Sequence, residues 1–168
     1  MKPSRRIDST PAIVAIVLTA ILTAAGLAFA GQAVGRPAAA WPGRPAAQPP
    51  HVKGAAGPPA AWLETHTRSL WLAFSSFCWK TTCADYPPPQ SRTDLPGVAV
   101  RRGAAVRVHF AFAPSQVHAT TFVGMKFKHT TLRPARTVSW QPTLTGVVSF
   151  DVRGAAGSAS YVARVRVR

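Results

Sequence analysis

Apolar and polar residues alternate along several windows in the second half of the chain. Between positions 104 and 112 every second residue is apolar, with Arg107 and His109 between them, and a period of two returns at 117–127 and 161–168. This period places alternate side chains on opposite faces of an extended strand. The three windows therefore predict β-strands that each have one buried face.

Shorter apolar segments predict further strands at 70–79, 98–101, 137–140 and 147–152. Turn-forming residues separate the strands at Arg102-Gly103, at Ala113-Pro114-Ser115 and at Gly154 to Gly157. We find no segment in this part with the 3.6-residue period of an amphipathic helix. Roughly six to eight short strands over residues 62–168 predict an all-β fold, a small antiparallel β-sandwich.

The end of the chain resembles the last strands of immunoglobulin-like domains in exported bacterial envelope proteins. Trp140 and Pro142 precede the segment Gly-Val-Val-Ser-Phe-Asp-Val, and a glycine-rich turn leads to Tyr161-x-Ala-x-Val-x-Val. The resemblance covers about 30 residues and lacks the cysteine pair that joins the two sheets of true immunoglobulin domains. It implies an immunoglobulin-like sandwich and assigns no activity.

The N-terminal part of the chain has a different pattern. Residues 1–11 carry Lys2, Arg5 and Arg6, and residues 12–30 form an uncharged run of 19 apolar or small residues. At a rise of about 1.5 Å per residue, such a helix is roughly 28 Å long and matches the hydrocarbon core of a bilayer. The basic cluster before the helix predicts that the N-terminus lies inside and that the rest is exported.

Two main interpretations of this run stay open. An uncleaved transmembrane anchor is favoured because the run is longer than the apolar region of an ordinary signal peptide. Ala28-Phe29-Ala30 also fits a signal cleavage site, and the run becomes a weaker anchor after Thr23. A buried helix of a soluble protein is the third alternative. We expect a single-pass cell-membrane protein with an extracytoplasmic C-terminal domain, and a secreted protein as the alternative.

Residues 31–61 predict a disordered linker rich in Pro, Ala and Gly. This segment contains seven prolines and has no strand or helix periodicity. Proline lacks the backbone donor that central strands and helix interiors need. We therefore expect a semi-extended spacer that holds the β-domain away from the membrane.

The two cysteines of the chain, Cys78 and Cys83, have four residues between them. In an oxidising compartment such a pair predicts a disulfide, whereas a redox site would favour Cys-x-x-Cys and a metal site would need further ligands. The short loop around them suggests a contact surface formed by Trp79, Lys80 and Tyr86. In the alternative interpretation, both aromatic residues belong to the core.

The chain is strongly basic, with 20 Lys and Arg residues against 5 Asp and Glu. The final window places three arginines on one strand face, and further basic residues join them in a candidate patch for polyanions: Arg101, Arg102, Arg107, Arg164, Arg166 and Arg168, with Lys126 and Lys128. The alternative is that these charges only solvate a surface or protect an edge strand. Anionic envelope polymers or lipids are the expected partners, because no aromatic-interleaved nucleic-acid motif is present.

Catalytic motifs are absent from the sequence, and its carboxylates beyond residue 30 are scattered at Glu64, Asp85, Asp94 and Asp151. We predict no enzyme activity, no cofactor and no metal site. The histidines at 109, 118 and 129, with Met125, are conceivable metal ligands, although their spacing matches no known pattern. The sequence favours a membrane-tethered binding or structural module that contacts an envelope polyanion or envelope protein. The alternative is a secreted domain for a metal or small ligand.

Overall fold

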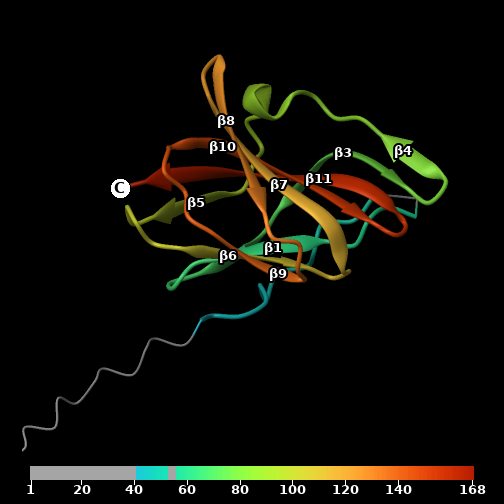
Figure 1. Ribbon diagram of the computed structural model, residues 1–168, viewed down its shortest axis with the longest axis horizontal. Helices are drawn as coiled ribbons and strands as arrows, with labels where there is room; N and C mark the ends of the chain where they lie inside the picture. Colours follow the sequence, from blue (N-terminus) through green and yellow to red (C-terminus); the bar gives the residue numbers. More distant parts are fainter. Residues whose placement is uncertain (1–40, 53–55) are drawn as a thin grey trace, which may run out of the picture. The chain divides into compact units, whose positions relative to one another are not determined.

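The computed structural model describes residues 41–52 and 56–168 (Figure 1). The basic residues 1–11, the run 12–30 and the first part of the expected linker lie outside the described residues. In the part that is described, no helix is long and apolar enough to cross a membrane.

The described residues form eleven strands in two sheets, together with one short 3-10 helix, η1 (Pro89–Ser91). The first sheet has the order β2 (Ser69–Trp71), β1 (Ala61–Glu64), β6 (Val106–Phe110), β9 (Thr137–Trp140). The second has the order β4 (Thr82–Ala84), β3 (Ala73–Trp79), β11 (Gly157–Val167), β10 (Gly146–Gly154), β7 (Pro114–Val123), β8 (Lys126–Leu132). A further strand, β5 (Gly97–Val100), pairs with the C-terminal half of β11 and is parallel to it, whereas all other pairs are antiparallel.

The inner faces of the two sheets share one hydrophobic core. Val106, Val108 and Phe110 are buried, as the alternation in their window predicts. On β10 the side chain of Phe150 is fully buried, and its ring meets Trp140 of the other sheet edge-on at 5.2 Å. The prediction of an all-β fold with antiparallel strand pairing is therefore confirmed, apart from the parallel pair of β5 and β11.

Two of the expected strands are divided in the structure. The window 117–127 is not one strand, because β7 ends at Val123 and β8 begins at Lys126. Gly124 at the turn has φ +57°, a conformation that glycine adopts without steric cost. The window 70–79 is divided into β2 and β3, which belong to different sheets. Apolar residues on both sides of Gly124 continue the alternation across the β7–β8 turn. The sequence pattern therefore did not indicate where β7 ends.

The second half of the expected linker contacts the first sheet. The Trp71 indole N–H donates to the carbonyl of Ala47 at 2.6 Å, and the guanidinium of Arg44 lies 5.0 Å from the Trp71 ring centroid. The backbone N–H of Gly43 donates to the buried carboxylate of Glu64 at 2.6 Å. Prolines prevent this segment from forming a strand, but its other groups still bind the sheet.

Candidate polyanion-binding site

Three arginines lie at the C-terminal end of β11, two within the strand and Arg168 directly after it. Arg164, Arg166 and Arg168 are exposed, whereas Ala163 and Val165, which lie between or beside them, are fully buried. This alternation follows from the pleat of the strand, which sends successive side chains to opposite faces. Sequence analysis placed the three arginines on one face, and the burial of their neighbours agrees with that placement.

The parallel pairing of β5 with β11 adds two more arginines. Arg101 and Arg102 follow β5 directly, and both are exposed. The backbone N–H of Arg102 donates to the carbonyl of Arg168 at 2.7 Å, and the N–H of Arg168 donates to that of Val100 at 3.0 Å. These bonds bring five arginines, which we call the arginine end, to one end of the second sheet: Arg101, Arg102, Arg164, Arg166 and Arg168.

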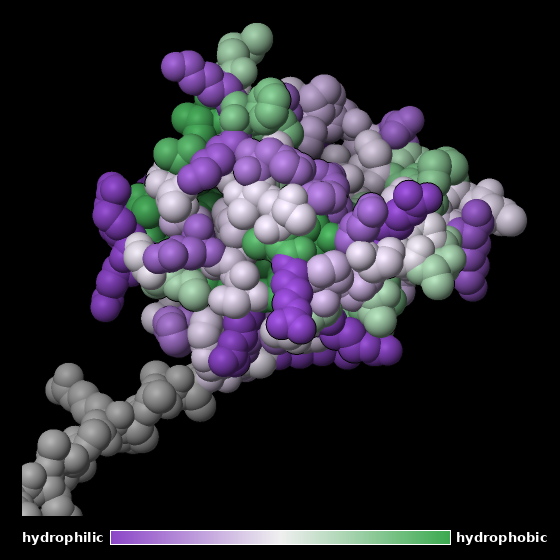
Figure 2. Space-filling model, in the orientation of Figure 1, coloured by the Kyte–Doolittle hydropathy of each residue, from purple (hydrophilic) through white to green (hydrophobic). Residues whose placement is uncertain are grey.

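A groove of about 420 Å³ lies at the arginine end, between β5, β11 and the start of β10. Arg164, Arg166 and Arg168 line it together with small residues such as Gly97 and Thr145, and no residue of its lining is acidic. Figure 2 shows hydrophilic side chains that project from the end of the molecule where Figure 1 places β5 and the C-terminus. The groove is therefore open to an anionic group and is surrounded by positive charge.

Arg107 belongs to a different surface. It lies on β6, and its guanidinium is 4.0 Å from the ring centroid of Trp41 in the segment that crosses the first sheet. The structure thus brings together five of the six candidate arginines and separates the sixth from them. The sequence could not predict this, because the contact joins residues 66 positions apart.

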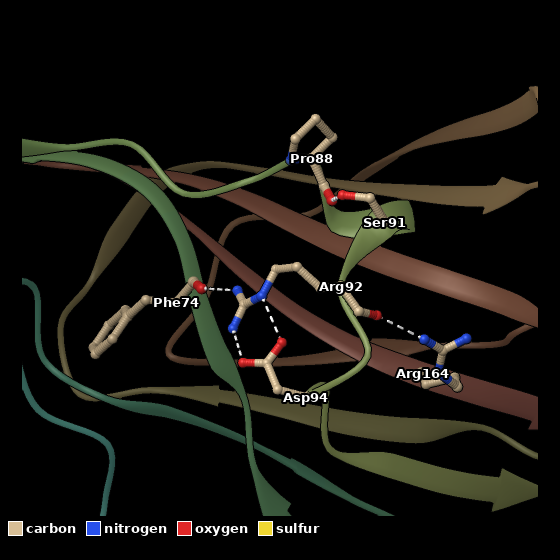
Figure 3. A network of polar contacts seen from close by, with 6 residues as sticks. All are labelled: Phe74, Pro88, Ser91, Arg92, Asp94 and Arg164. Atoms are coloured by element: carbon tan, nitrogen blue, oxygen red, sulfur yellow. Dashed lines mark hydrogen bonds and ion pairs between the residues drawn. The ribbon is translucent and has the colours of Figure 1, made fainter.

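A polar network fixes the position of Arg164 (Figure 3). The Arg164 guanidinium donates to the carbonyl of Arg92 at 2.8 Å. Arg92 in turn donates to the carboxylate of Asp94 at 2.6 Å and 3.0 Å, and to the carbonyl of Phe74 on β3. The network ties the loop before β5 to β3 and to β11. This loop therefore supports one side of the arginine end.

This network makes the stability of the loop depend on acid pH. The hydrogen bonds between Arg92 and Asp94 lower the pKa of the Asp94 carboxyl and raise the pKa of Arg92. Because the carboxyl pKa is lower in the folded chain, the ion pair stabilises the protein above about pH 4, the ordinary Asp pKa, and this contribution disappears as pH falls through the lowered value. At neutral pH, we expect the urea midpoint of unfolding to be slightly higher for the wild type than for Asp94→Asn. The two midpoints should converge once the pH falls below the lowered pKa of Asp94, and a difference that stays constant throughout the acid range would contradict this assignment.

The disulfide prediction is confirmed, and the contact surface expected around it is largely buried. Cys78 and Cys83 are bonded and lie opposite one another on β3 and β4. The Trp79 side chain is 5% exposed and packs on Phe112 with ring centroids 4.8 Å apart, so it is part of the core. Tyr86 is half-buried, beneath the guanidinium of Arg92, and Lys80 is exposed at the turn.

The candidate metal ligands do not form one cluster. His118 and His129 stack with ring centroids 5.0 Å apart, and each bonds a threonine hydroxyl on the neighbouring strand. His109 lies on the first sheet, where it pairs with Glu64 at 2.9 Å. Among the described residues, no group of three or more His, Cys, Asp or Glu side chains is arranged to hold a metal ion.

Sequence analysis missed one exposed feature, which we call the apolar tip. The side chains of the tip are the exposed large hydrophobic residues of the described part: Val123, Met125, Phe127 and Leu144, with exposed fractions of 42%, 100%, 71% and 41%. Three of them lie at the turn between β7 and β8. An apolar residue directly after a glycine turn was the available signal, but it was interpreted as the continuation of a strand.

Comparison with known proteins identifies no relative. No protein-family model matches the chain, and no curated protein or solved structure is significantly similar to it. The functional argument therefore depends on the geometry and charge of the site.

Proposed function

We propose that this chain is a membrane-tethered extracytoplasmic module without enzyme activity that binds anionic polymers of the envelope at its arginine end. The observation that carries the proposal is a groove that three exposed arginines line, Arg164, Arg166 and Arg168, without any acidic lining residue. Two further exposed arginines follow β5 at the same end of the second sheet. Guanidinium groups pair with phosphate and carboxylate oxygens through two parallel hydrogen bonds. Arginines on alternate positions of a strand are about 6.6 Å apart, a spacing that suits a ligand with repeated charges.

The position of β11 argues against edge protection as the reason for these arginines. Positive side chains commonly protect an unpaired edge strand from aggregation. At Arg164, β11 pairs with Val147 of β10 on one side and with Gly97 of β5 on the other, so the strand has no free edge there. At Arg166 it still pairs with Ala99 of β5. Binding of an anionic ligand therefore explains these outward-facing arginines better than protection of an edge strand does.

The rest of the proposal concerns the cellular location of the domain and its fold. The expected anchor or signal helix would place the domain outside the cytoplasm. The expected spacer would hold the domain away from the membrane surface. Two mainly antiparallel sheets around one core are compatible with the immunoglobulin-like sandwich that the C-terminal motif implies. In this proposal the scaffold presents the arginine end to the envelope and holds it rigidly.

Removing three charges at the arginine end is expected to weaken polymer binding. The full chain in an uncharged detergent would be titrated with long-chain inorganic polyphosphate. The variant Arg164→Gln/Arg166→Gln/Arg168→Gln should bind roughly 10- to 100-fold more weakly than the wild type, because each arginine near an anionic surface contributes about 1 kcal/mol or less.

A matched variant separates local recognition from total charge. Arg133→Gln/Arg136→Gln/Arg153→Gln removes the same charge from exposed positions of the β8–β9 connection and of β10, outside the arginine end. Its polyphosphate affinity should stay within about threefold of the wild type at moderate salt, because charges beyond a Debye length of about 10 Å are largely screened. Equal losses in the two variants would overturn the proposed site.

A further inference from the structure

The apolar tip exposes more hydrophobic surface than a solvated hairpin needs. Met125 is fully exposed and Phe127 is 71% exposed, although both are large apolar side chains. Figure 1 shows the β7–β8 hairpin projecting from the body of the domain. Contiguous exposed apolar residues on a soluble domain commonly mark a surface that another molecule or a membrane covers.

Two lysines lie next to the apolar residues of the tip in the sequence. Lys126 and Lys128 alternate with Met125 and Phe127 along the start of β8, and both lysines are exposed. The ammonium group of Lys128 donates to the hydroxyl of Thr143 at 3.2 Å, in the loop that also carries Leu144. The tip therefore combines apolar and positively charged side chains within one short hairpin and the adjacent loop.

The same loop connects the tip to the arginine end. The backbone N–H of Val167 on β11 donates to the hydroxyl of Thr145 at 2.9 Å. On its other side this loop is close to β7. A Cβ added at Gly146 would meet the carbonyl oxygen of Phe122 and the side chain of Val123, which both belong to β7. The loop before β10 thus packs between β7 and the arginine-bearing end of β11. The apolar tip and the arginine end lie at the same end of the second sheet.

We propose that this end of the domain docks on an anionic lipid bilayer, with Met125 and Phe127 inserted at the interface and the surrounding lysines and arginines on lipid phosphates. This inference depends on the proposed function and specifies its polyanion as a lipid surface. A hydrated polymer would leave the apolar tip in water, whereas a bilayer covers it and attracts the basic side chains. Burial of the tip and neutralisation of the charges then favour the same orientation of the domain.

The two methionines of the chain provide a selective test, because only Met1 and Met125 carry the labelled group. The full chain would be labelled with 13C-methyl methionine and placed in nanodiscs that contain lipids spin-labelled within the acyl chains. In discs rich in phosphatidylglycerol, the Met125 methyl signal should lose most of its intensity to the spin label. In pure phosphatidylcholine discs the loss should be small, because the basic side chains find no anionic headgroups.

Variants separate the apolar and charged contributions. Phe127→Ser should shift the docked population in anionic discs roughly tenfold towards the free state, since less apolar surface is buried. Arg164→Gln/Arg166→Gln/Arg168→Gln should have a similar effect. Lys80→Gln, at the exposed β3–β4 turn, should give the same Met125 signal as the wild type.

The outcomes distinguish this inference from the proposed function. If polyphosphate binding requires the arginine end but Met125 keeps its full intensity in anionic discs, membrane docking is overturned and polymer binding stands. If the chain binds neither polyphosphate nor anionic discs through the arginines, both proposals fail. Equal broadening of Met125 in the two kinds of disc would overturn the role assigned to charge.

Discussion

Phe150→Ala is expected to lower the free energy of unfolding by about 3–5 kcal/mol, a typical cost of a large-to-small change in a packed core. Phe150 lies on β10 near the middle of the second sheet, and its side chain is fully buried. The centroid of its ring lies 5.2 Å from that of Trp140 in the first sheet. The truncation therefore removes an aromatic contact between the sheets and leaves a cavity. Urea unfolding followed by tryptophan fluorescence would measure the change.

A matched phenylalanine provides the control for this prediction. Phe127 is 71% exposed at the apolar tip, so Phe127→Ala should change the free energy of unfolding by no more than about 0.5 kcal/mol. If the two substitutions destabilise the chain equally, the assignment of Phe150 to the core and of Phe127 to the surface is wrong.

Gly157→Ala is expected to destabilise the chain by about 3 kcal/mol or more, because backbone strain and a steric clash add at this position. Gly157 begins β11 with φ +140°, a conformation that residues with a Cβ rarely adopt. An alanine Cβ would also lie 2.1 Å from the carbonyl oxygen of Cys78 on β3. The β10–β11 hairpin would have to move away from β3, and the midpoint of thermal unfolding should fall by several degrees.

Gly97→Ala is the matched control. The nearest atom to an added Cβ at Gly97 is the Arg164 carbonyl oxygen at 3.8 Å, and the residue has no positive φ. This substitution should leave the unfolding midpoint unchanged or raise it slightly, since alanine reduces the entropy of the unfolded chain. A larger loss for Gly97→Ala than for Gly157→Ala would contradict the described hairpin.

The periodicity of the sequence was sufficient to predict the all-β fold but not the way in which its strands pair. Alternation is local, so it identified the half-buried faces around Val108 and Val165. The parallel pairing of β5 with β11 joins segments more than 60 residues apart, and no local pattern encodes it. The arginine end depends on that pairing, which is why Arg101 joins Arg166 whereas Arg107 does not.

Side-chain exposure was the least predictable property, because tertiary contacts decide it. Trp79 follows a cysteine near a turn and was a candidate for a contact surface, but Phe112 from a distant strand covers its ring. Met125 continued an apolar alternation and was expected in a strand, yet it lies fully exposed at the turn. The disulfide was predictable because the two cysteines of the chain are close in the sequence, so their pairing depends on local geometry.

The most direct test of polyanion binding at the arginine end is the salt dependence of polyphosphate binding by the wild type and by Arg164→Gln/Arg166→Gln/Arg168→Gln. Titrations between about 50 and 200 mM salt give the slope of the logarithm of affinity against the logarithm of salt concentration. If each arginine neutralises one phosphate, the slope of the variant should be shallower by about two, from roughly 0.7 per contact on a single-stranded polyanion. Parallel slopes in the two proteins would show that these arginines release no counterions and would contradict the proposal.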